Sequence, residues 1–306
     1  MITKGQIIKM LREEKGLTQP VLAEGICNQT TLSRVESGRQ EPSSRIFNQL
    51  IEKMGENPQS YMFAMTTTEK RAIELDREIT NLLDGDKYEE AEKLLEEMES
   101  LKELDEGSRG FVRFSRIFIA TGRGLPKIEA IKELNEAFSW LSKLVDKAGR
   151  YQRTNYTKCL LSKNDLQVLS FLAICYIEVE EAQAIEIFYL QKLYIERVIA
   201  DDEVFANSYT AVTYNLSRQL GGAQKYEEAL TVAEDGLKWA DQYDRSAGLD
   251  GLILNKACVL IEMDNVSVEG VELLNLCYLS FKRKDRHTTC EKIRAFALNH
   301  DVSIIF

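Results

Sequence analysis

Residues 16–42 read GLTQPVLAEGICNQTTLSRVESGRQEP, which is the pattern of two short helices joined by a tight turn. Thr18 stands where it can cap a helix over residues 19–24, and Asn28 where it can cap a second helix that runs to Ser37 and ends at Gly38. Apolar residues fall where these helices must pack on each other and on the helix before them. They are Leu17, Leu22, Ala23, Ile26, Leu32 and Val35.

The second of these helices leaves a polar face uncovered. That face carries an amide, hydroxyls and a guanidinium, which are the groups that contact base edges and phosphates in a DNA major groove. An ordinary three-helix piece of a larger helical domain is the alternative, but start, stop, polarity and spacing all favour a DNA-reading helix-turn-helix. The polar residues are Gln29, Thr30, Thr31, Ser33 and Arg34.

Residues 4–63 resemble the repressor-type (XRE) helix-turn-helix family of phage repressors and their bacterial relatives. The resemblance implies that Arg12 pairs with Glu36 and clamps the first helix to the recognition helix. It also implies a fourth helix that begins at residues 42–44 and ends at residues 55–58. The implied DNA-binding set is Gln19 on a phosphate, Gln29, Thr30 and Thr31 on bases, Arg34 one turn on, and the capping Asn28.

Composition predicts an all-α protein. Only four prolines and 17 glycines occur in 306 residues, 44% of which are apolar, and alternating β-branched runs are absent. The six cysteines form no Cys-x-x-Cys, and with two histidines and no glycine-rich phosphate loop we expect neither a metal site, nor a cofactor, nor an enzyme. No apolar run reaches membrane-spanning length and no signal-peptide core is present, so we expect a cytosolic protein without membrane contact.

Charge is distributed unevenly along the chain. Residues 1–65 carry eight Lys/Arg and seven Asp/Glu, whereas the remainder carries 31 and 42, and the net charge is −10. The acidic remainder of the chain repels phosphate at long range. Affinity for DNA must therefore come from basic residues near the recognition helix and from two helix-turn-helix domains that bind together. We call the helix-turn-helix domain, residues 1–65, the DNA reader. The charge pattern therefore predicts a homodimer on a roughly palindromic operator.

Beyond the DNA reader, one helical theme occurs five times. A capping box at Thr66 and Glu69 opens a helix over about 67–83, and the repeated segments begin at Tyr88, Ile128 and three later positions. In each segment one small residue recurs, after intervals of 39, 54, 45 and 41 positions. These residues are Ala91, Ala130, Ala184, Ala229 and Gly270. The longest interval holds a polar, basic stretch over residues 147–163, which we expect to be a loop or an extension between repeats.

The theme resembles the tetratricopeptide repeat, a helix pair whose small residue lets two helices approach closely. Stacked pairs share a core and curl into a superhelix with a concave inner surface. We therefore predict two domains: a helix-turn-helix domain over 1–65, and a right-handed α-superhelix of about five degenerate repeats over 66–306 for peptide binding and dimerisation.

The first helix of each pair should line the concave surface. Its inner stripe should hold Ser170, Ala173 and Tyr176 in one repeat, Asn207, Ala211, Asn215 and Arg218 in the next, and Leu252, Asn255, Val259 and Glu262 in the last. An Asn side chain both donates and accepts hydrogen bonds, so it can pair with a peptide backbone. The predicted peptide-binding residues are Tyr176, Asn207, Ala211, Asn215, Arg218 and Asn255. Solvated polar residues without a ligand are the alternative.

A repressor-type reader followed by degenerate repeats resembles the peptide-pheromone regulators of Gram-positive bacteria, the RRNPP group, and its PlcR-like members above all. The resemblance implies a cytosolic dimer whose concave groove binds a short signalling peptide, which shifts the population between two dimer geometries and so changes operator affinity.

Two other functions stay open at this point. The repeat domain could dock a protein partner in place of a peptide, which a mass spectrum of peptide retained by the purified protein would distinguish. The chain could also be an enzyme, since Rap-type relatives promote phosphate loss from a response regulator. An intact DNA reader and the absence of a general-base cluster disfavour the enzyme.

Overall fold

The computed structural model describes residues 3–58, 60–61, 67–101, 104, 106–158, 161–198, 206–243, 248–264 and 267–304. Within these ranges the regular structure is helical, apart from an isolated bridge between Val145 and Tyr151. The predicted all-α class is confirmed. None of the helices in the described part of the chain is both long and apolar enough to cross a membrane.

The chain divides into two compact units. The first comprises residues 1–179 with 198–202, and the second residues 180–197 with 203–306. This division falls inside the repeats and not near residue 65, although the reader has an apolar core of its own.

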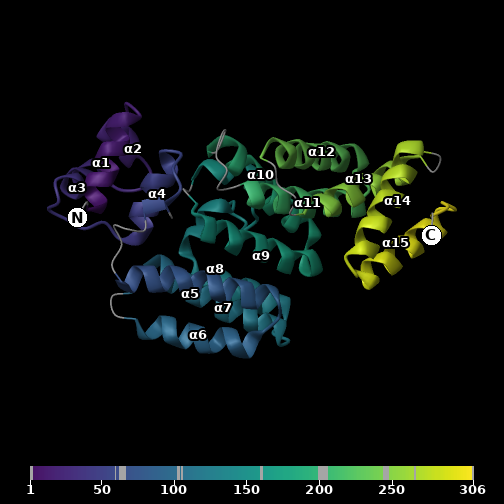
Figure 1. Ribbon diagram of the computed structural model, residues 1–306, viewed down its shortest axis with the longest axis horizontal. Coiled ribbons are helices and arrows are strands. Elements are labelled where there is room, and N and C mark those ends of the chain that lie inside the picture. The colour runs from purple at the N-terminus through teal and green to yellow at the C-terminus, as the bar shows by residue number, and fades with distance from the viewer. Residues whose placement is uncertain are drawn as a thin grey trace. The chain divides into compact units, whose positions relative to one another are not determined.

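The helix-turn-helix has the predicted arrangement, with small shifts at the helix ends. Asn28 caps the recognition helix, because its Oδ1 accepts a hydrogen bond from the Thr31 N–H at 2.7 Å. Thr18 occupies the N-cap position of the preceding helix, but its hydroxyl makes no capping bond, so the predicted cap at Thr18 is positional only. The four helices are α1 (Lys4–Glu14), α2 (Gln19–Ala23), α3 (Gln29–Glu36) and α4 (Ser44–Lys53) (Figure 1).

A tight contact between α1 and α3 fixes the recognition helix. A Cβ atom on Gly5 would lie 2.0 Å from the carbonyl oxygen of Val35, so only glycine permits this approach. Beneath it, Ile8, Leu32 and Val35 are fully buried. The remaining buried residues of this core come from α1, α2 and α4 with its C-cap and are Ile7, Leu11, Leu22, Ala23, Phe47, Leu50, Ile51 and Met54.

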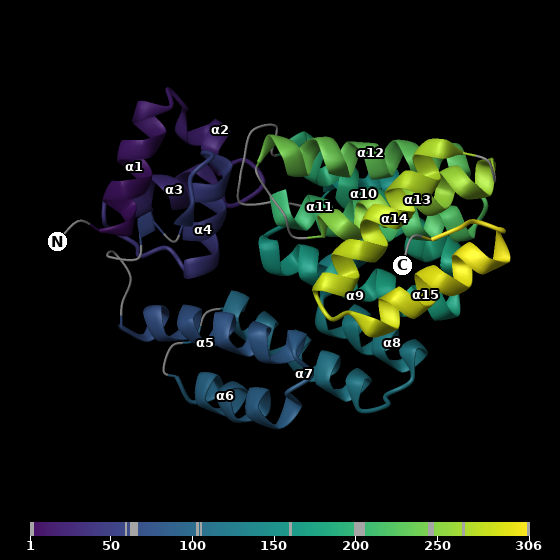
Figure 2. The ribbon, with the colours of Figure 1, turned by 45° about the vertical axis from the view of Figure 1, so that its right-hand side comes forward.

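The repeat helices follow in antiparallel succession. Each of the five small residues lies fully buried on the second helix of a sequence pair, where a larger side chain would force the two helices apart. In the first unit the helices are α5 (Thr67–Asp84), α6 (Tyr88–Ser100), α7 (Glu106–Gly122), α8 (Lys127–Ala137) and α9 (Lys163–Val179). In the second unit they are α10 (Glu181–Val198), α11 (Ala206–Gly222), α12 (Tyr226–Gln242), α13 (Leu249–Met263), α14 (Val268–Arg283) and α15 (His287–Asn299). Figure 2 shows α11 beside α12 and α5 beside α6.

Three of the turns between helices share one backbone conformation. Asp86, Gln224 and Asp285 adopt φ of 54°, 59° and 54°, between α5 and α6, α11 and α12, and α14 and α15. The N–H of the next residue donates to a carbonyl five positions back in each turn, as in Lys87 to Leu82 at 2.9 Å. Three junctions of the repeat domain therefore share one turn conformation. Thr66 of the predicted capping box, and the side chain of Glu69, lie outside the described residues.

The described residues between α8 and α9 form an extension with regular structure. It holds the 3₁₀-helix η2 (Ser139–Leu144), which precedes the predicted stretch of residues 147–163, and the 3₁₀-helix η3 (Arg153–Lys158) within that stretch, with the Val145–Tyr151 bridge between them. Residues 159–160 lie outside the described residues. Of the two expectations for this stretch, the inter-repeat extension describes it and the plain loop does not.

Candidate nucleic-acid interface

The polar face of α3 is open. Gln29, Thr30 and Arg34 are exposed and Thr31 is half-buried at the N-terminal end of the helix. Asn28 is exposed as well, with its side-chain oxygen engaged in the cap. The helix therefore presents amide, hydroxyl and guanidinium groups from its first two turns, where a recognition helix meets base edges.

The structure brings Arg12 and Glu36 together in a bidentate pair beneath that face. Arg12 Nε donates to Glu36 Oε1 at 2.6 Å and an Arg12 terminal nitrogen donates to Oε2 at 2.8 Å. The side chains are only 12% and 4% exposed, so the two charges depend on each other. Arg12 also donates to the carbonyl of Leu17 at 2.9 Å, which ties the loop before α2 to the same pair.

The pair sets the protonation of Glu36. Burial alone would raise the pKa of this carboxyl, but hydrogen bonds from Arg12 and Gln19 and the Arg12 charge outweigh burial and leave the pKa below its ordinary value of 4.5. Glu36 is therefore ionised at neutral pH.

Gln19 is the third member of this cluster. Its Nε2 donates to Glu36 Oε2 at 2.9 Å, so the amide at the start of α2 is held by the same carboxylate that holds Arg12. A side-chain amide nitrogen carries two hydrogens, and one remains for a phosphate oxygen. Sequence reasoning placed Gln19 toward DNA but gave no sign of its bond to Glu36.

Lys53, at the end of α4, is a further residue that the sequence did not single out. Its Nζ donates to the carbonyl oxygens of Val21 at 2.6 Å and Glu24 at 2.8 Å. A cation thus binds the last carbonyls of α2, which has only five residues, and stabilises it from its C-terminal end. Burial lowers the pKa of Lys53.

In the second unit, α11 carries a row of groups suited to a ligand. Ala211 and Arg218 are exposed and Asn215 lies between them, half-buried, with its amide nitrogen donating to the carbonyl of Ala211 at 3.1 Å. This bond lies within the helix, so the amide remains at the surface. Arg218 makes no ion pair with any residue that the structure describes.

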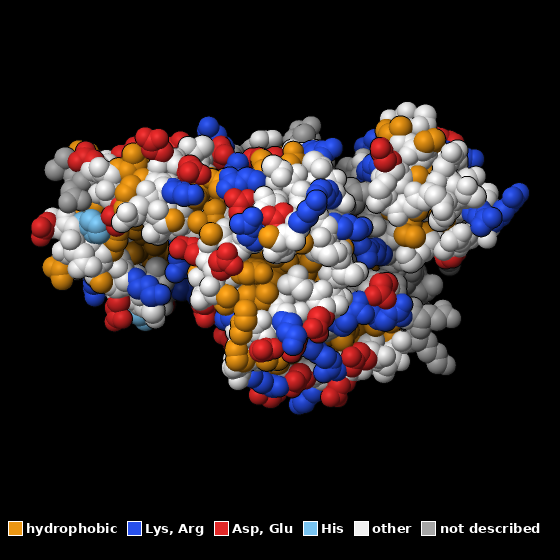
Figure 3. Space-filling view, turned by 180° about the vertical axis from the view of Figure 1, so that it is seen from behind, with side chains coloured by type: hydrophobic (Ala, Val, Ile, Leu, Met, Phe, Trp, Pro, Cys, Tyr) orange, Lys and Arg blue, Asp and Glu red, His pale blue; other side chains and the backbone are white. Residues whose placement is uncertain are grey.

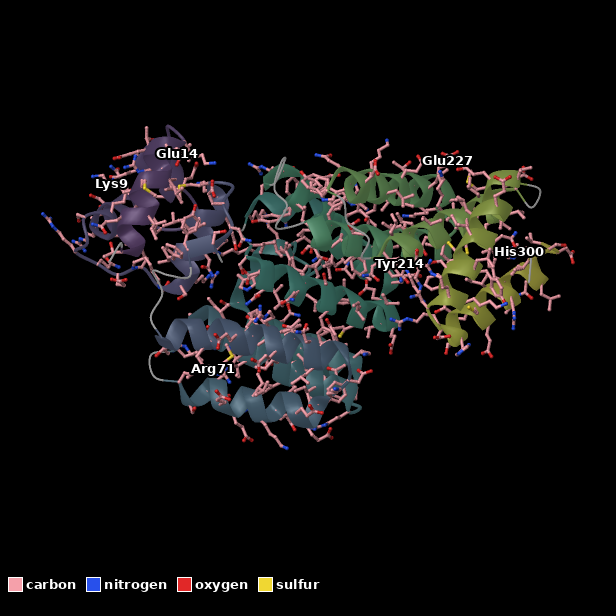
Figure 4. All side chains as sticks on the ribbon, in the orientation of Figure 1. Lys9, Glu14, Arg71, Tyr214, Glu227 and His300 are labelled. Carbon is pink, nitrogen blue, oxygen red and sulfur yellow. The ribbon has the colours of Figure 1, made fainter. Side chains whose placement is uncertain are left out.

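Asn255 has a different environment. Its amide nitrogen donates to the carbonyl of Tyr214 at 2.9 Å and to the hydroxyl of Ser217 at 2.8 Å, joining α13 to α11. Tyr214, labelled in Figure 4, also packs on Gly251, where a Cβ would approach its ring to 2.7 Å. The carbonyl oxygen of Asn255 is therefore the side-chain group left for a ligand.

The other predicted inner-stripe positions differ in exposure. Tyr176, in the first unit, is half-buried and packs edge to face against Tyr151, with the two ring centroids 5.9 Å apart. The side chain of Asn207 lies outside the described residues. Three predictions for this stripe are wrong: Ala173, Leu252 and Val259 are 0%, 0% and 4% exposed. Since neighbouring helices cover both sides of α9 and α13, these apolar residues pack in the core.

No group of three or more His, Cys, Asp or Glu in the described ranges is placed to hold a metal ion. Cys175 and Cys277 are buried, and burial raises the pKa of each thiol, to about 11 and about 12 respectively. Both cysteines thus pack as small core residues.

Comparison with known proteins agrees with this organisation. Residues 8–60 match the family model described as Helix-turn-helix. No curated protein sequence matches the chain.

Solved structures resemble the chain over nearly its whole length. The crystal structure of Bacillus thuringiensis PlcR in complex with the peptide PapR7 and DNA is 20% identical, with a TM-score of 0.59, over 96% of this chain and 99% of PlcR. PlcR in its apo form is 16% identical, with a TM-score of 0.58, over 95% and 98%. ComR from S. thermophilus, in complex with DNA and its signalling peptide, is 17% identical, with a TM-score of 0.50, over 98% and 100%. The chain thus contains a helix-turn-helix domain over residues 8–60, and as a whole it has the fold of PlcR and ComR.

Proposed function

We infer that this protein is a sequence-specific transcriptional regulator whose affinity for DNA is controlled by a short signalling peptide bound to the repeat domain. The observation that carries this function is the combination, in one chain, of an open recognition helix with the fold of PlcR and ComR, each of which has a crystal structure in complex with DNA and a peptide. As a DNA-binding regulator it acts in the cytosol, without enzymatic activity.

The DNA-binding half of the proposal rests on α3 and its support. Gln29, Thr30, Thr31 and Arg34 contact bases, and Gln19 donates its remaining amide hydrogen to a phosphate. Two copies of the chain act as a homodimer, which presents two recognition helices to a roughly palindromic operator.

The peptide half rests on the row Ala211, Asn215 and Arg218. A small residue beside an amide leaves room for an extended backbone, which Asn215 can pair with through its donor and its acceptor. Arg218 is placed one turn further on to bind a carboxylate, from a side chain or the peptide C-terminus. Tyr176, Asn207 and Asn255 extend this set as further candidates.

The test of the function is DNA binding with and without peptide. Protein purified from its own cells is used to select duplexes from a random-sequence pool, and their binding is measured with and without the peptide fraction of spent culture medium. We expect enrichment of a roughly palindromic sequence and a change in affinity on adding the fraction. A protein that enriches no sequence, or one whose affinity ignores the fraction while a protein partner co-purifies, contradicts the proposal.

Substitution of two asparagines distinguishes a role in peptide binding from a role in packing. We expect Asn215→Ala to abolish the peptide response with folding and peptide-free DNA binding unchanged, because its amide is bonded only within α11. The loss in peptide affinity should be about 1–3 kcal/mol. Asn255→Ala should instead lower the free energy of unfolding by about 0.5–1.5 kcal/mol, because it breaks the bonds between α13 and α11.

Isothermal titration with the active peptide and urea unfolding of both variants check this pair. Thr231→Ala is a suitable control, since its exposed hydroxyl also bonds only within its own helix, to Glu227. Unchanged peptide affinity in Asn215→Ala would show that the row Ala211, Asn215 and Arg218 on α11 does not bind the peptide.

A further inference from the structure

The extension that follows α8, residues 139–158, differs in charge from the rest of the chain, and we refer to it as the basic insertion. It contains five Lys/Arg and one acidic residue, Asp146, although the chain as a whole has 49 acidic and 39 basic residues. A positive segment of this size in an acidic repeat domain needs an explanation.

The basic insertion has a built framework. Tyr151 is 1% exposed and its hydroxyl donates to Asn135 Oδ1 at 2.8 Å. Asn155 donates to the carbonyl of Val145 at 3.3 Å, and Asp146 accepts hydrogen bonds from the N–H groups of Ala148 and Arg150 at 2.8 and 3.0 Å. The positive side chains therefore extend from a fixed scaffold.

Three of these positive charges, on Lys143, Lys147 and Lys158, have no acidic partner among the described residues. The carboxylate of Asp146 faces Arg150 at 3.3 Å, while Lys143, Lys147 and Lys158 are exposed and form no ion pair with the described residues. Arginines of α5 and α7 contrast with them. Arg71, labelled in Figure 4, bonds Glu97 at 2.8 Å, and Arg116 bonds Glu99 at 2.6 Å.

The mixing of opposite charges on α5 to α7 is visible on the surface. Red and blue side chains alternate along the lower edge of Figure 3, the region that holds α5 to α7 in Figure 1. The arginines of α7 are held by carboxylates of α6 and α7, whereas three lysines of the basic insertion have no ion pair among the described residues and can bind an anion from outside the protein.

The basic insertion lies beside the DNA reader within the first compact unit. One surface cleft is lined by residues of both. The reader contributes the turn at Gly25 and Ile26 and the side chain of Arg45, and the basic insertion contributes Lys143 and Lys158. Basic residues of the two segments thus share one cleft next to the turn that precedes the recognition helix.

We propose that the basic insertion is a second DNA-contacting surface, which binds backbone phosphates of the same duplex that α3 reads. This inference rests on the proposed DNA-binding function. DNA is the polyanion that the neighbouring reader already holds, and the reader itself, with eight basic and seven acidic residues over 1–65, has little attraction for phosphate. Lysine ammonium groups bind phosphates without reading sequence, so this surface adds affinity and not specificity.

The experiment measures salt dependence. The triple variant Lys143→Gln/Lys147→Gln/Lys158→Gln is compared with wild type on a fluorescent random-sequence duplex and on a duplex selected by the wild-type protein. Each lost phosphate contact lowers the slope of log affinity against log salt by about 0.9, so we expect a slope that is less steep by up to about 2.7 per chain. Affinity should fall equally for both duplexes, with their ratio unchanged.

Two controls make the result specific. Lys225→Gln/Lys238→Gln/Lys292→Gln removes three exposed lysines of the second unit and should leave the slope as in wild type. Replacing the three lysines of the basic insertion by arginine should restore the slope. Circular dichroism of each variant verifies folding.

The outcomes separate this inference from the proposed function. If Arg34→Ala changes sequence preference but the glutamine triple keeps the wild-type slope, the DNA-binding function stands and the inference is wrong. An equal change in the second-unit control also overturns it, because general charge then explains the effect. If the wild-type protein binds neither duplex, both the proposed DNA-binding function and this inference are wrong.

Discussion

At the scale of single residues, the reader depends on a carboxylate that accepts three hydrogen bonds from two partners. Glu36 accepts bonds from Arg12 and Gln19, and Arg12 reaches back to the carbonyl of Leu17. One acidic side chain at the end of α3 therefore connects three of the segments that must keep their relative positions for a helix to enter a groove. Gly5 performs a complementary role, because its missing side chain lets α1 approach the backbone of α3.

Glu36→Ala tests this arrangement. The substitution leaves the Arg12 guanidinium, 12% exposed, without its counter-ion, and breaking a buried pair in this way costs about 3–5 kcal/mol. We expect the reader's unfolding transition in the full chain to move to lower urea concentration. Glu13→Ala is the matched control, since Glu13 is 57% exposed and 3.5 Å from Arg12. Equal stability of the two variants would show that the pair does not hold the reader together.

The lowered pKa of Glu36 predicts a dependence on pH. The folded carboxyl has a pKa below the ordinary 4.5, so its ionised form stabilises the fold above that value, and the stabilisation is lost as the pH falls through the folded pKa. Urea unfolding from about pH 6 downwards should show wild type losing its advantage over Glu36→Gln in acid. A constant difference between the two proteins at all pH values would contradict the shift.

At the scale of elements, the two faces of α3 differ: one is exposed to solvent and the other packs against the rest of the reader. Its exposed face holds Gln29 and Arg34, while Leu32, Val35 and Glu36 on the opposite face are buried against the other helices of the reader. A change on the exposed face should therefore alter binding without altering folding.

We expect Gln29→Ala and Arg34→Ala each to cost about 1–3 kcal/mol on the selected duplex and to relax preference at one base position. Gln19→Ala should weaken all duplexes about equally, since we expect Gln19 to contact a phosphate, and a phosphate contact carries no sequence information. Selection of duplexes by each variant gives the preferences. Our assignment of α3 as the recognition helix fails if both exposed-face variants select the wild-type sequence.

At the scale of the whole molecule, the net charge bears on how many chains must bind one duplex together. The chain carries −10, and its reader is nearly neutral, so one copy has little general attraction for a duplex. We expect the DNA-bound species to be a two-fold dimer on half-sites spaced by whole helical turns. Light scattering of the protein with a saturating duplex measures the stoichiometry. One protein chain per duplex at saturation would contradict the dimer.

The sequence by itself determined the local features of this protein. The Asn28 cap, the stop at Gly38, the exposed polar face of α3 and the five small residues of the repeats are short-range patterns, and the structure contains them where the spacing placed them. Such patterns are readable because backbone conformation and helical periodicity depend on neighbours within a few positions. The class of fold followed from the same periodicity.

Tertiary structure alone decided which polar and small residues are committed to packing. Asn215 and Asn255 occupy equivalent-looking positions in sequence, yet one bonds within its helix and the other bridges to α11. Likewise Leu252 and Val259 are buried against the expectation of an inner face, and Gly5 is indispensable because of a carbonyl 30 positions away. The physical reason is that burial and hydrogen bonding between helices depend on which neighbours pack against each stripe, and helical periodicity gives the stripe but not the neighbour.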